Sequence, residues 1–75
     1  MIKLKKETVH VSSAAIKKAE YNYDNRVLKL IFANGSKYNY HKVSPETFLS
    51  MKYSESIGSY INKHILRNYS FTHDK

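Results

Sequence analysis

Two tyrosines in the middle of the chain are spaced for stacking on a ligand. Tyr38 and Tyr40 lie two residues apart, so their rings project from the same face of a β-strand. Nucleic acid bases stack on such rings with about 1–3 kcal/mol each, and a neighbouring Lys37 can neutralise a phosphate. The alternative is that both rings pack in the core with their hydroxyls at the surface. The spacing therefore predicts either an aromatic ligand platform or a pair of core residues.

A second group of polar residues, near the C-terminal end, suits an anion. Lys63 and Arg67 are four residues apart, which places both cations on one side of a helix with Asn62 beside them. Gly58, shortly after Ser56, would let backbone N–H groups approach an anion at the positive end of that helix. The alternative is an ordinary capped helix with a solvated basic face. The pattern makes this segment a candidate phosphate clamp.

The remaining reactive residue types form no catalytic pattern. The four histidines share no metal-ligand spacing, and the six carboxylates are scattered without an obvious pair. Ser12 and Ser13 have no nearby histidine and acid in a nucleophile arrangement. The chain has no cysteine, and Gly35 and Gly58 stand alone, so it has neither a thiolate site nor a glycine-rich phosphate loop. We therefore expect no enzymatic activity, no metal and no cofactor.

The charge of the chain indicates the kind of partner. Thirteen Lys and Arg against six Asp and Glu give a net charge of +7, which attracts polyanions by long-range steering and also favours solubility. A chain of 75 residues buries only a small core, so extra burial would have to come from a homo-oligomer. No apolar run approaches the roughly 20 residues that span a bilayer, and the basic N-terminus lacks the apolar stretch of a secretory signal. We expect a cytoplasmic protein with an acidic partner.

The first half of the chain predicts a three-stranded antiparallel meander. The strands are residues 16–23, 27–32 and 37–40. Asn34-Gly35 favours a tight type I′ turn before the last of them, and Asp24-Asn25 supplies a turn after the first. Residues 8–11 could add a fourth strand at the N-terminal edge. One face of this sheet should meet helices, and the other face, which carries Val27 and Ile31, could meet a partner.

The second half predicts two helices, so the fold class is α+β. Ser44-Pro45-Glu46 has the residue types of a helix start, and a second helix begins at residues 54–56. Apolar residues of the second helix recur at steps of three and four as one stripe toward the sheet: Ile57, Tyr60, Ile61, His64, Ile65 and Tyr69. On this stripe we expect His64 to be a hydrogen-bonded structural imidazole. Residues 70–75 have no pattern and are predicted to fray.

Several of these residues occur in an order that resembles the KTSC domain. The likeness rests on Ser12-Ser13 before Ala14-Ala15-Ile16, on Tyr38-Asn39-Tyr40, and on the run from Ser56 to Ile65 that contains Gly58, Tyr60, Asn62 and His64. It covers residues 9–69, between a basic segment at 1–8 and the tail at 70–75. Ile57, Ile61 and Leu66 depart from the family pattern and make the last helix more apolar, which suggests an altered partner or a subunit interface. The family takes its name from the C-terminus of some lysyl-tRNA synthetases and also occurs in stand-alone bacterial and phage proteins, and the resemblance implies RNA binding.

Three functions are consistent with these residues. The first is non-enzymatic binding of RNA or tRNA through its phosphates. The second is a homo-oligomeric phage protein that sequesters a small cyclic nucleotide at a subunit interface, in the cytoplasm of a bacterial host. The third is a protein–protein interaction module with an acidic partner. The candidate ligand-binding residues are Tyr38, Tyr40, Lys37, Ser12, Ser13, Ser56, Tyr60, Asn62, Lys63, His64 and Arg67.

Overall fold

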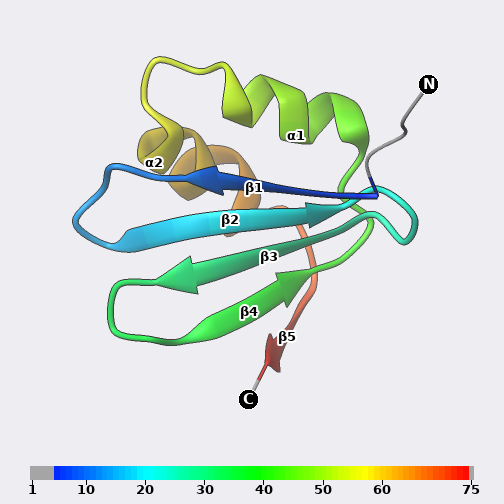
Figure 1. The fold of residues 1–75 in the computed structure, drawn as a ribbon, viewed down its shortest axis with the longest axis horizontal. Helices are drawn as coiled ribbons and strands as arrows, with labels where there is room; N and C mark the ends of the chain where they lie inside the picture. The colour runs from blue at the N-terminus through cyan, green and yellow to red at the C-terminus, as the bar shows by residue number, and fades with distance from the viewer. Residues whose placement is uncertain (1–4, 75) are drawn as a thin grey trace.

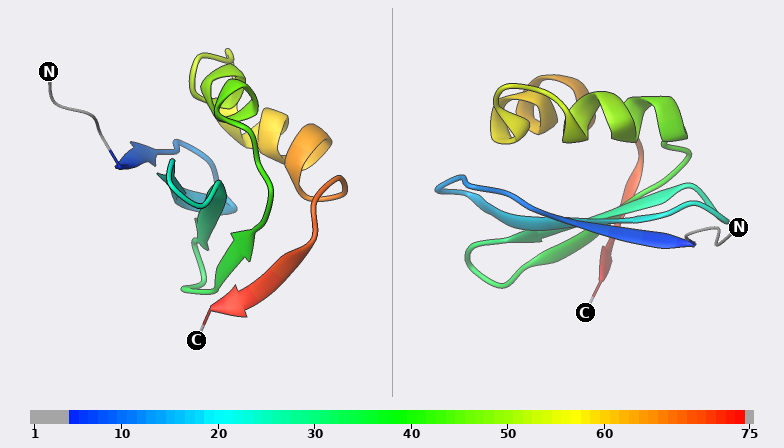
Figure 2. Two further views of the ribbon diagram at one scale, coloured as in Figure 1. Left: turned by 90° about the vertical axis from the view of Figure 1, so that its right-hand side faces the viewer. Right: turned by 45° about the horizontal axis from the view of Figure 1, so that its top comes forward.

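An antiparallel sheet carries helices over one of its two faces in the computed structural model, which describes residues 5–74 (Figure 1). The elements in chain order are β1 (Lys6–His10), β2 (Ile16–Asn22), β3 (Val27–Phe32), β4 (Lys37–Tyr40), α1 (Pro45–Lys52), α2 (Ile57–Tyr60), the π-helical segment η1 (Ile61–Ile65) and β5 (Phe71–Asp74). The strand order in the sheet follows the chain, β1-β2-β3-β4-β5. Both helices lie on the same side of the sheet (Figure 2). The α+β class and the two helices are confirmed, but the sheet has five strands rather than three or four.

The two additional strands lie at the ends of the chain. The expected N-terminal edge strand forms as β1, at Lys6–His10 rather than at residues 8–11, and pairs with β2. The segment predicted to fray contains β5, which pairs with β4 so that Phe71 lies opposite Tyr40 and His73 opposite Tyr38. Aromatic contacts across this register supply packing that no periodicity in the tail had indicated. Residues 1–4 of the basic segment lie outside the described part of the chain.

The hairpin turns occur where they were predicted but with different backbone geometry. Gly35 has a φ of +91°, whereas Asn34 keeps a negative φ, so the type I′ turn is wrong. The Gly35 N–H donates to the Phe32 carbonyl at 3.0 Å and the Phe32 N–H donates to the Ser36 carbonyl at 2.8 Å. This is a three-residue loop in which a left-handed glycine forms a bulge. In the β2–β3 turn the left-handed residue is Arg26, with a φ of +57°, rather than Asp24 or Asn25.

The core lies between the helices and one face of the sheet. Leu28 and Leu30 of β3 are fully buried, as are Phe48 of α1 and Ile61 and Ile65 of the last helical segment. Burial of a side chain of this size contributes about 1.5–3 kcal/mol. The two serines predicted to start the helices do so, because the Ser44 hydroxyl accepts from the Thr47 N–H and the Ser56 hydroxyl from the Ser59 N–H.

Tyr21 links the centre of the sheet to the first helix. Its ring stacks on Phe48 with the ring centroids 4.6 Å apart, and its hydroxyl donates to the Val43 carbonyl at 2.5 Å. Burial raises the pKa of Tyr21 above its ordinary value. The hydroxyl therefore satisfies a carbonyl in the segment that leads from β4 into α1.

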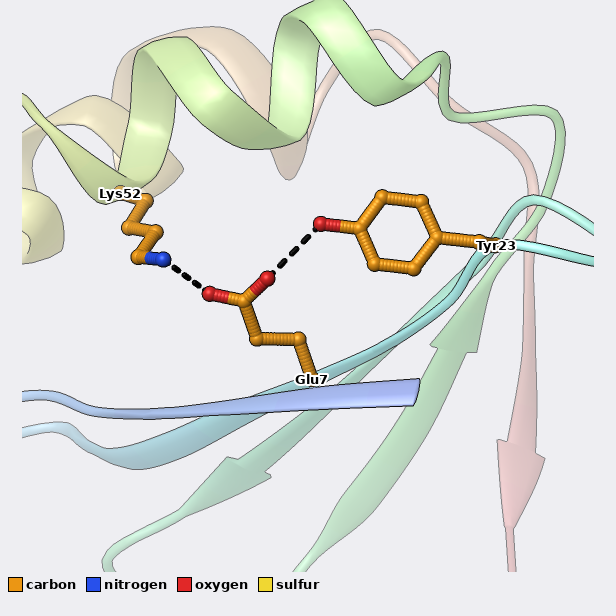
Figure 3. Close-up of polar contacts among 3 residues, drawn as sticks. All are labelled: Glu7, Tyr23 and Lys52. Atoms are coloured by element: carbon orange, nitrogen blue, oxygen red, sulfur yellow. Dashed lines mark hydrogen bonds and ion pairs between the residues drawn. The ribbon is translucent and has the colours of Figure 1, made fainter. Parts of the chain in front are cut away.

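A partly buried polar contact fastens the edge strand β1 to helix α1 (Figure 3). The Tyr23 hydroxyl donates to Glu7 Oε1 at 2.8 Å, and the Lys52 ammonium donates to Glu7 Oε2. These bonds from Lys52 and Tyr23 hold the pKa of the Glu7 carboxyl below 4.5. Burial and the bond to Glu7 raise the pKa of Tyr23 to about 12. The ionised Glu7 is thus the form that joins β1 to α1 and to the turn that follows β2.

We expect Tyr21→Phe to lower the free energy of unfolding by about 1–3 kcal/mol, because it leaves the buried Val43 carbonyl without its donor. Urea denaturation followed by circular dichroism measures the change. Tyr53→Phe is the matched control, since Tyr53 is 75% exposed and should unfold like the parent protein. Equal stability of the two variants would contradict the role of the Tyr21 hydroxyl.

Glu7→Gln should destabilise the fold in a pH-dependent way. The lowered pKa of Glu7 means that its contribution is complete above the unfolded value of about 4.5 and disappears as the pH falls through the lower folded value. The urea midpoint of the variant should therefore be below that of the parent at neutral pH and approach it in stronger acid. Glu55→Gln, at an exposed position, controls for the loss of one charge. A midpoint difference that stays constant from neutral to acid would argue against this contact.

Candidate functional site

The loop between β1 and β2 lies close against the start of α2, where residue 58 is glycine. A Cβ atom on Gly58 would lie 3.0 Å from Ser13 Oγ and 3.1 Å from Ser13 Cβ, so an alanine here would require the Ser13 side chain to shift by a few tenths of an ångström. The loop has its own local order, since the Ser13 hydroxyl accepts from the Ala15 N–H at 3.2 Å. Two segments more than 40 residues apart in the chain are thus brought into contact.

Two adjoining hollows extend from this contact along the last helical segment. One, of about 420 Å³, is lined by Ser12, Ser13, Ala15, Ile16, Phe32, Ser56, Gly58, Ser59, Asn62 and Leu66. The other, of about 410 Å³, is lined by Ser59, Asn62, Lys63 and Arg67. Ser59 and Asn62 line both hollows, so the two form one surface depression. We call this depression the basic cleft.

The electrostatics of the basic cleft favour an anion. Lys63 and Arg67 are exposed and form no ion pair with any residue in the range 5–74. No carboxylate is among the residues that line either hollow. No neighbouring carboxylate among the described residues therefore competes with a ligand for these two cations.

Hydroxyl and amide groups supply further donors in the basic cleft. The oxygens of Ser13 and Ser56 each accept a backbone N–H within the chain, so each hydroxyl hydrogen remains free to donate outward. The Asn62 side chain offers two more N–H donors. Cations together with hydroxyl and amide donors are the groups that bind phosphate oxygens. The arrangement can hold a phosphate, and it contains no group placed to act as a nucleophile or general base.

The opposite face of the sheet also carries lysines, but acidic residues pair with two of them. Lys29 Nζ lies 2.9 Å from Asp74 Oδ2 and Lys18 Nζ lies 3.5 Å from Glu20 Oε2. The bond to Asp74 raises the pKa of Lys29 and lowers that of Asp74. Ile31, expected to give this face an apolar character, is only 7% exposed. This face is therefore less cationic than its lysine content suggests.

Tyr38 and Tyr40 do not form the predicted platform as a pair, because Tyr40 is buried in the core. Both rings project to the helix side of β4, opposite Leu30 and Leu28 of β3, where Tyr40 is 4% exposed and belongs to the core. Burial raises the pKa of Tyr40. Tyr38 is half-buried, and Lys37 projects to the opposite face because successive residues of a strand alternate. These three residues do not line the basic cleft.

Tyr60 and His64 also lie outside the hollows of the basic cleft. Their rings contact each other with centroids 4.5 Å apart, Tyr60 half-buried and His64 exposed. The expectation of a structural imidazole at His64 is therefore wrong. The reason is the π-helical geometry of η1, in which the Leu66 N–H donates to the Ile61 carbonyl, five residues back, at 3.0 Å. This wider turn keeps Ile61 and Ile65 in the core and leaves His64 at the surface.

The structure thus gathers Ser12, Ser13, Ser56, Asn62, Lys63 and Arg67 from the predicted site residues. Six other lining residues were not among the predicted site residues: Ala15, Ile16, Phe32, Gly58, Ser59 and Leu66. Ser59 could have been found, because it lies three and four residues before Asn62 and Lys63 on the same helix. Phe32 gave no such signal, since it comes from β3 and is distant in sequence from every helical residue of the basic cleft.

Two negative findings concern the described residues. Within residues 5–74, no three or more His, Asp or Glu side chains are grouped so that they could hold a metal ion. In the same range, every helix is too short or too polar to cross a membrane.

Comparison with known proteins identifies the family. The family model of the KTSC domain matches residues 12–69. The chain belongs to the KTSC domain family. The residues that line the basic cleft, from Ser12 to Arg67, all lie within the matched part of the KTSC domain, whereas β5 lies beyond it.

Two similar proteins extend this comparison. A protein of Tsukamurella paurometabola is 38% identical over 52 residues, which are 69% of this chain and 78% of that protein. The crystal structure of a KTSC domain protein from Yersinia pestis superposes with a TM-score of 0.84 at 23% identity, covering 93% of this chain and 99% of that one. The second likeness establishes a shared fold. The KTSC domain thus keeps its sheet and helices while most of its side chains change.

Proposed function

We propose that this KTSC domain is a non-enzymatic RNA-binding protein that holds phosphates of the RNA in the basic cleft. The observation that carries the proposal is the position of Lys63 and Arg67, which lie beside serine and asparagine donors in a depression lined by no carboxylate. Contacts to phosphates dominate the affinity of proteins for nucleic acids. A cluster of unpaired cations with neutral donors is the chemistry that such contacts require.

The net charge of +7 supports a polyanionic ligand over a small anion. A long-range positive field speeds the encounter with an extended polymer of phosphates. Ion pairs with acidic residues offset the charge of two lysines on the opposite face. The helix side, where Lys63 and Arg67 lie, therefore attracts that polymer more strongly. RNA is therefore the ligand that best accounts for both the total charge and its distribution.

A small nucleotide is the second candidate, because each hollow has the volume of a typical small-molecule pocket. In this case the ligand would be enclosed between copies of the chain. Titration with cyclic dinucleotides, combined with light scattering, tests this alternative. Displacement of bound RNA by a cyclic dinucleotide at micromolar concentration, with a protein mass above that of the monomer, would favour it over RNA.

The double variant Lys63→Gln/Arg67→Gln should weaken RNA binding and flatten its salt dependence. Loss of two phosphate contacts lowers the slope of log K against log salt by about 1.4 for a single strand. Fluorescence anisotropy of a labelled oligonucleotide of mixed sequence, measured across a salt series, gives both quantities.

The matched control is Lys17→Gln/Lys37→Gln, which removes the same charge from exposed lysines at the opposite face. We expect it to keep most of the slope. If both double variants lose the same affinity and slope, the cations act only through net charge and the basic cleft is not the binding site. If the parent protein does not bind RNA at low salt, RNA is not its ligand.

A further inference from the structure

Four rings form a continuous surface on the helix side of the last three strands. Phe32 contacts Tyr38 with ring centroids 5.7 Å apart. Tyr38 in turn contacts Phe71 at 5.5 Å and stacks with His73 at 4.8 Å and an interplanar angle of 23°. We call Phe32, Tyr38, Phe71 and His73 the aromatic row. It brings together residues from β3, β4 and β5.

The helices leave the aromatic row accessible. Strand β5 extends away from α1 and α2 in all three views (Figures 1 and 2). Phe71 is 53% exposed and His73 is also exposed, while Phe32 and Tyr38 are half-buried. The half-buried rings are anchored against the core, so the row is both fixed in position and open to a ligand.

The aromatic row adjoins the basic cleft. Phe32 lines the same hollow as Ser12, Ser13 and Asn62. Asn62 also lines the hollow that contains Lys63 and Arg67. One surface therefore passes from two cations, across neutral hydrogen-bond donors, to a set of rings.

This order of groups matches the two chemical parts of an unpaired nucleotide chain. Phosphates require cations and donors, and unpaired bases stack on aromatic or histidine rings. In a duplex the base faces are already stacked on one another, so the rings would contribute nothing. A mixed surface of this kind consequently discriminates by strandedness rather than by charge alone.

We propose that the aromatic row stacks unpaired bases, so that the protein selects single-stranded RNA. This inference rests on the proposed function, and it specifies which form of RNA the basic cleft receives. Phe71 and His73 lie beyond the residues that match the family model. The rings of the aromatic row that are most exposed to bases therefore come from β5, outside the matched domain.

Binding of a single-stranded RNA of mixed sequence, compared with the same sequence in a duplex, tests the proposal. We expect the parent protein to prefer the single strand, and Phe71→Ala and His73→Ala each to weaken that binding about fivefold or more. Binding to the duplex should stay unchanged in both variants. The control Tyr53→Ala removes an exposed ring just after α1 that belongs to neither the aromatic row nor the basic cleft. It should bind both RNAs like the parent.

A conservative pair separates stacking from the stability of β5. Phe71→Leu keeps an apolar side chain against Tyr38 and Tyr40 but lacks an aromatic face, so it should lose single-strand binding like Phe71→Ala. Phe71→Tyr keeps the ring and should bind like the parent. Urea denaturation of all variants reports whether the fold is retained.

The outcomes distinguish this inference from the function on which it rests. RNA binding that depends on Lys63 and Arg67 but shows no preference for single strands, or is insensitive to Phe71→Leu and His73→Ala, overturns the stacking role alone. Absence of binding to either RNA overturns both. Loss of single-strand binding in Phe71→Leu with retention in Phe71→Tyr supports the aromatic row as the surface that holds the bases.

Discussion

Coverage of a five-stranded sheet by two short helical segments is the constraint from which the other features follow. The helices α1 and α2–η1 bury Leu28, Leu30 and Tyr21 in the centre of the sheet, but they do not reach all five strands (Figure 2). Packing is therefore dense at β2 and β3 and incomplete at β5. The exposed rings of β5 and the hollows beside η1 lie where this coverage ends.

The edges of the sheet are held by different means. At β1 the ionised Glu7 accepts from Tyr23 and Lys52, which connects the strand to α1 through polar groups. At β5 the strand is attached by ring contacts on one face and by the pair of Lys29 and Asp74 on the other. In a small domain with a limited core, such local contacts make the edge strands part of the fold.

The distribution of charge is as informative as its total. Acidic residues pair with two lysines of the open sheet face, whereas Lys63 and Arg67 line a hollow together with the hydroxyl of Ser59 and the amide of Asn62. Carboxylates near a cation compete with an incoming phosphate, and neutral donors assist its binding. The family fold is retained at 23% identity in the Yersinia pestis protein.

Local chemistry in the sequence was sufficient to locate most of the elements. The caps at Ser44 and Ser56, the hairpin at Gly35 and the apolar positions Ile61 and Ile65 depend on residues close together in the chain, and they occur where the pattern placed them. Tertiary packing decided the rest. Tyr38 and Tyr40 lie on the same face of β4, so their spacing could not predict which ring would be buried. Packing against the core buries Tyr40 and leaves Tyr38 half-buried. The pairing of β5 and the approach of Ser13 to Gly58 arise from contacts between distant segments. Periodicity carries no information about such contacts, because they depend on how the elements pack and not on the spacing within any one of them.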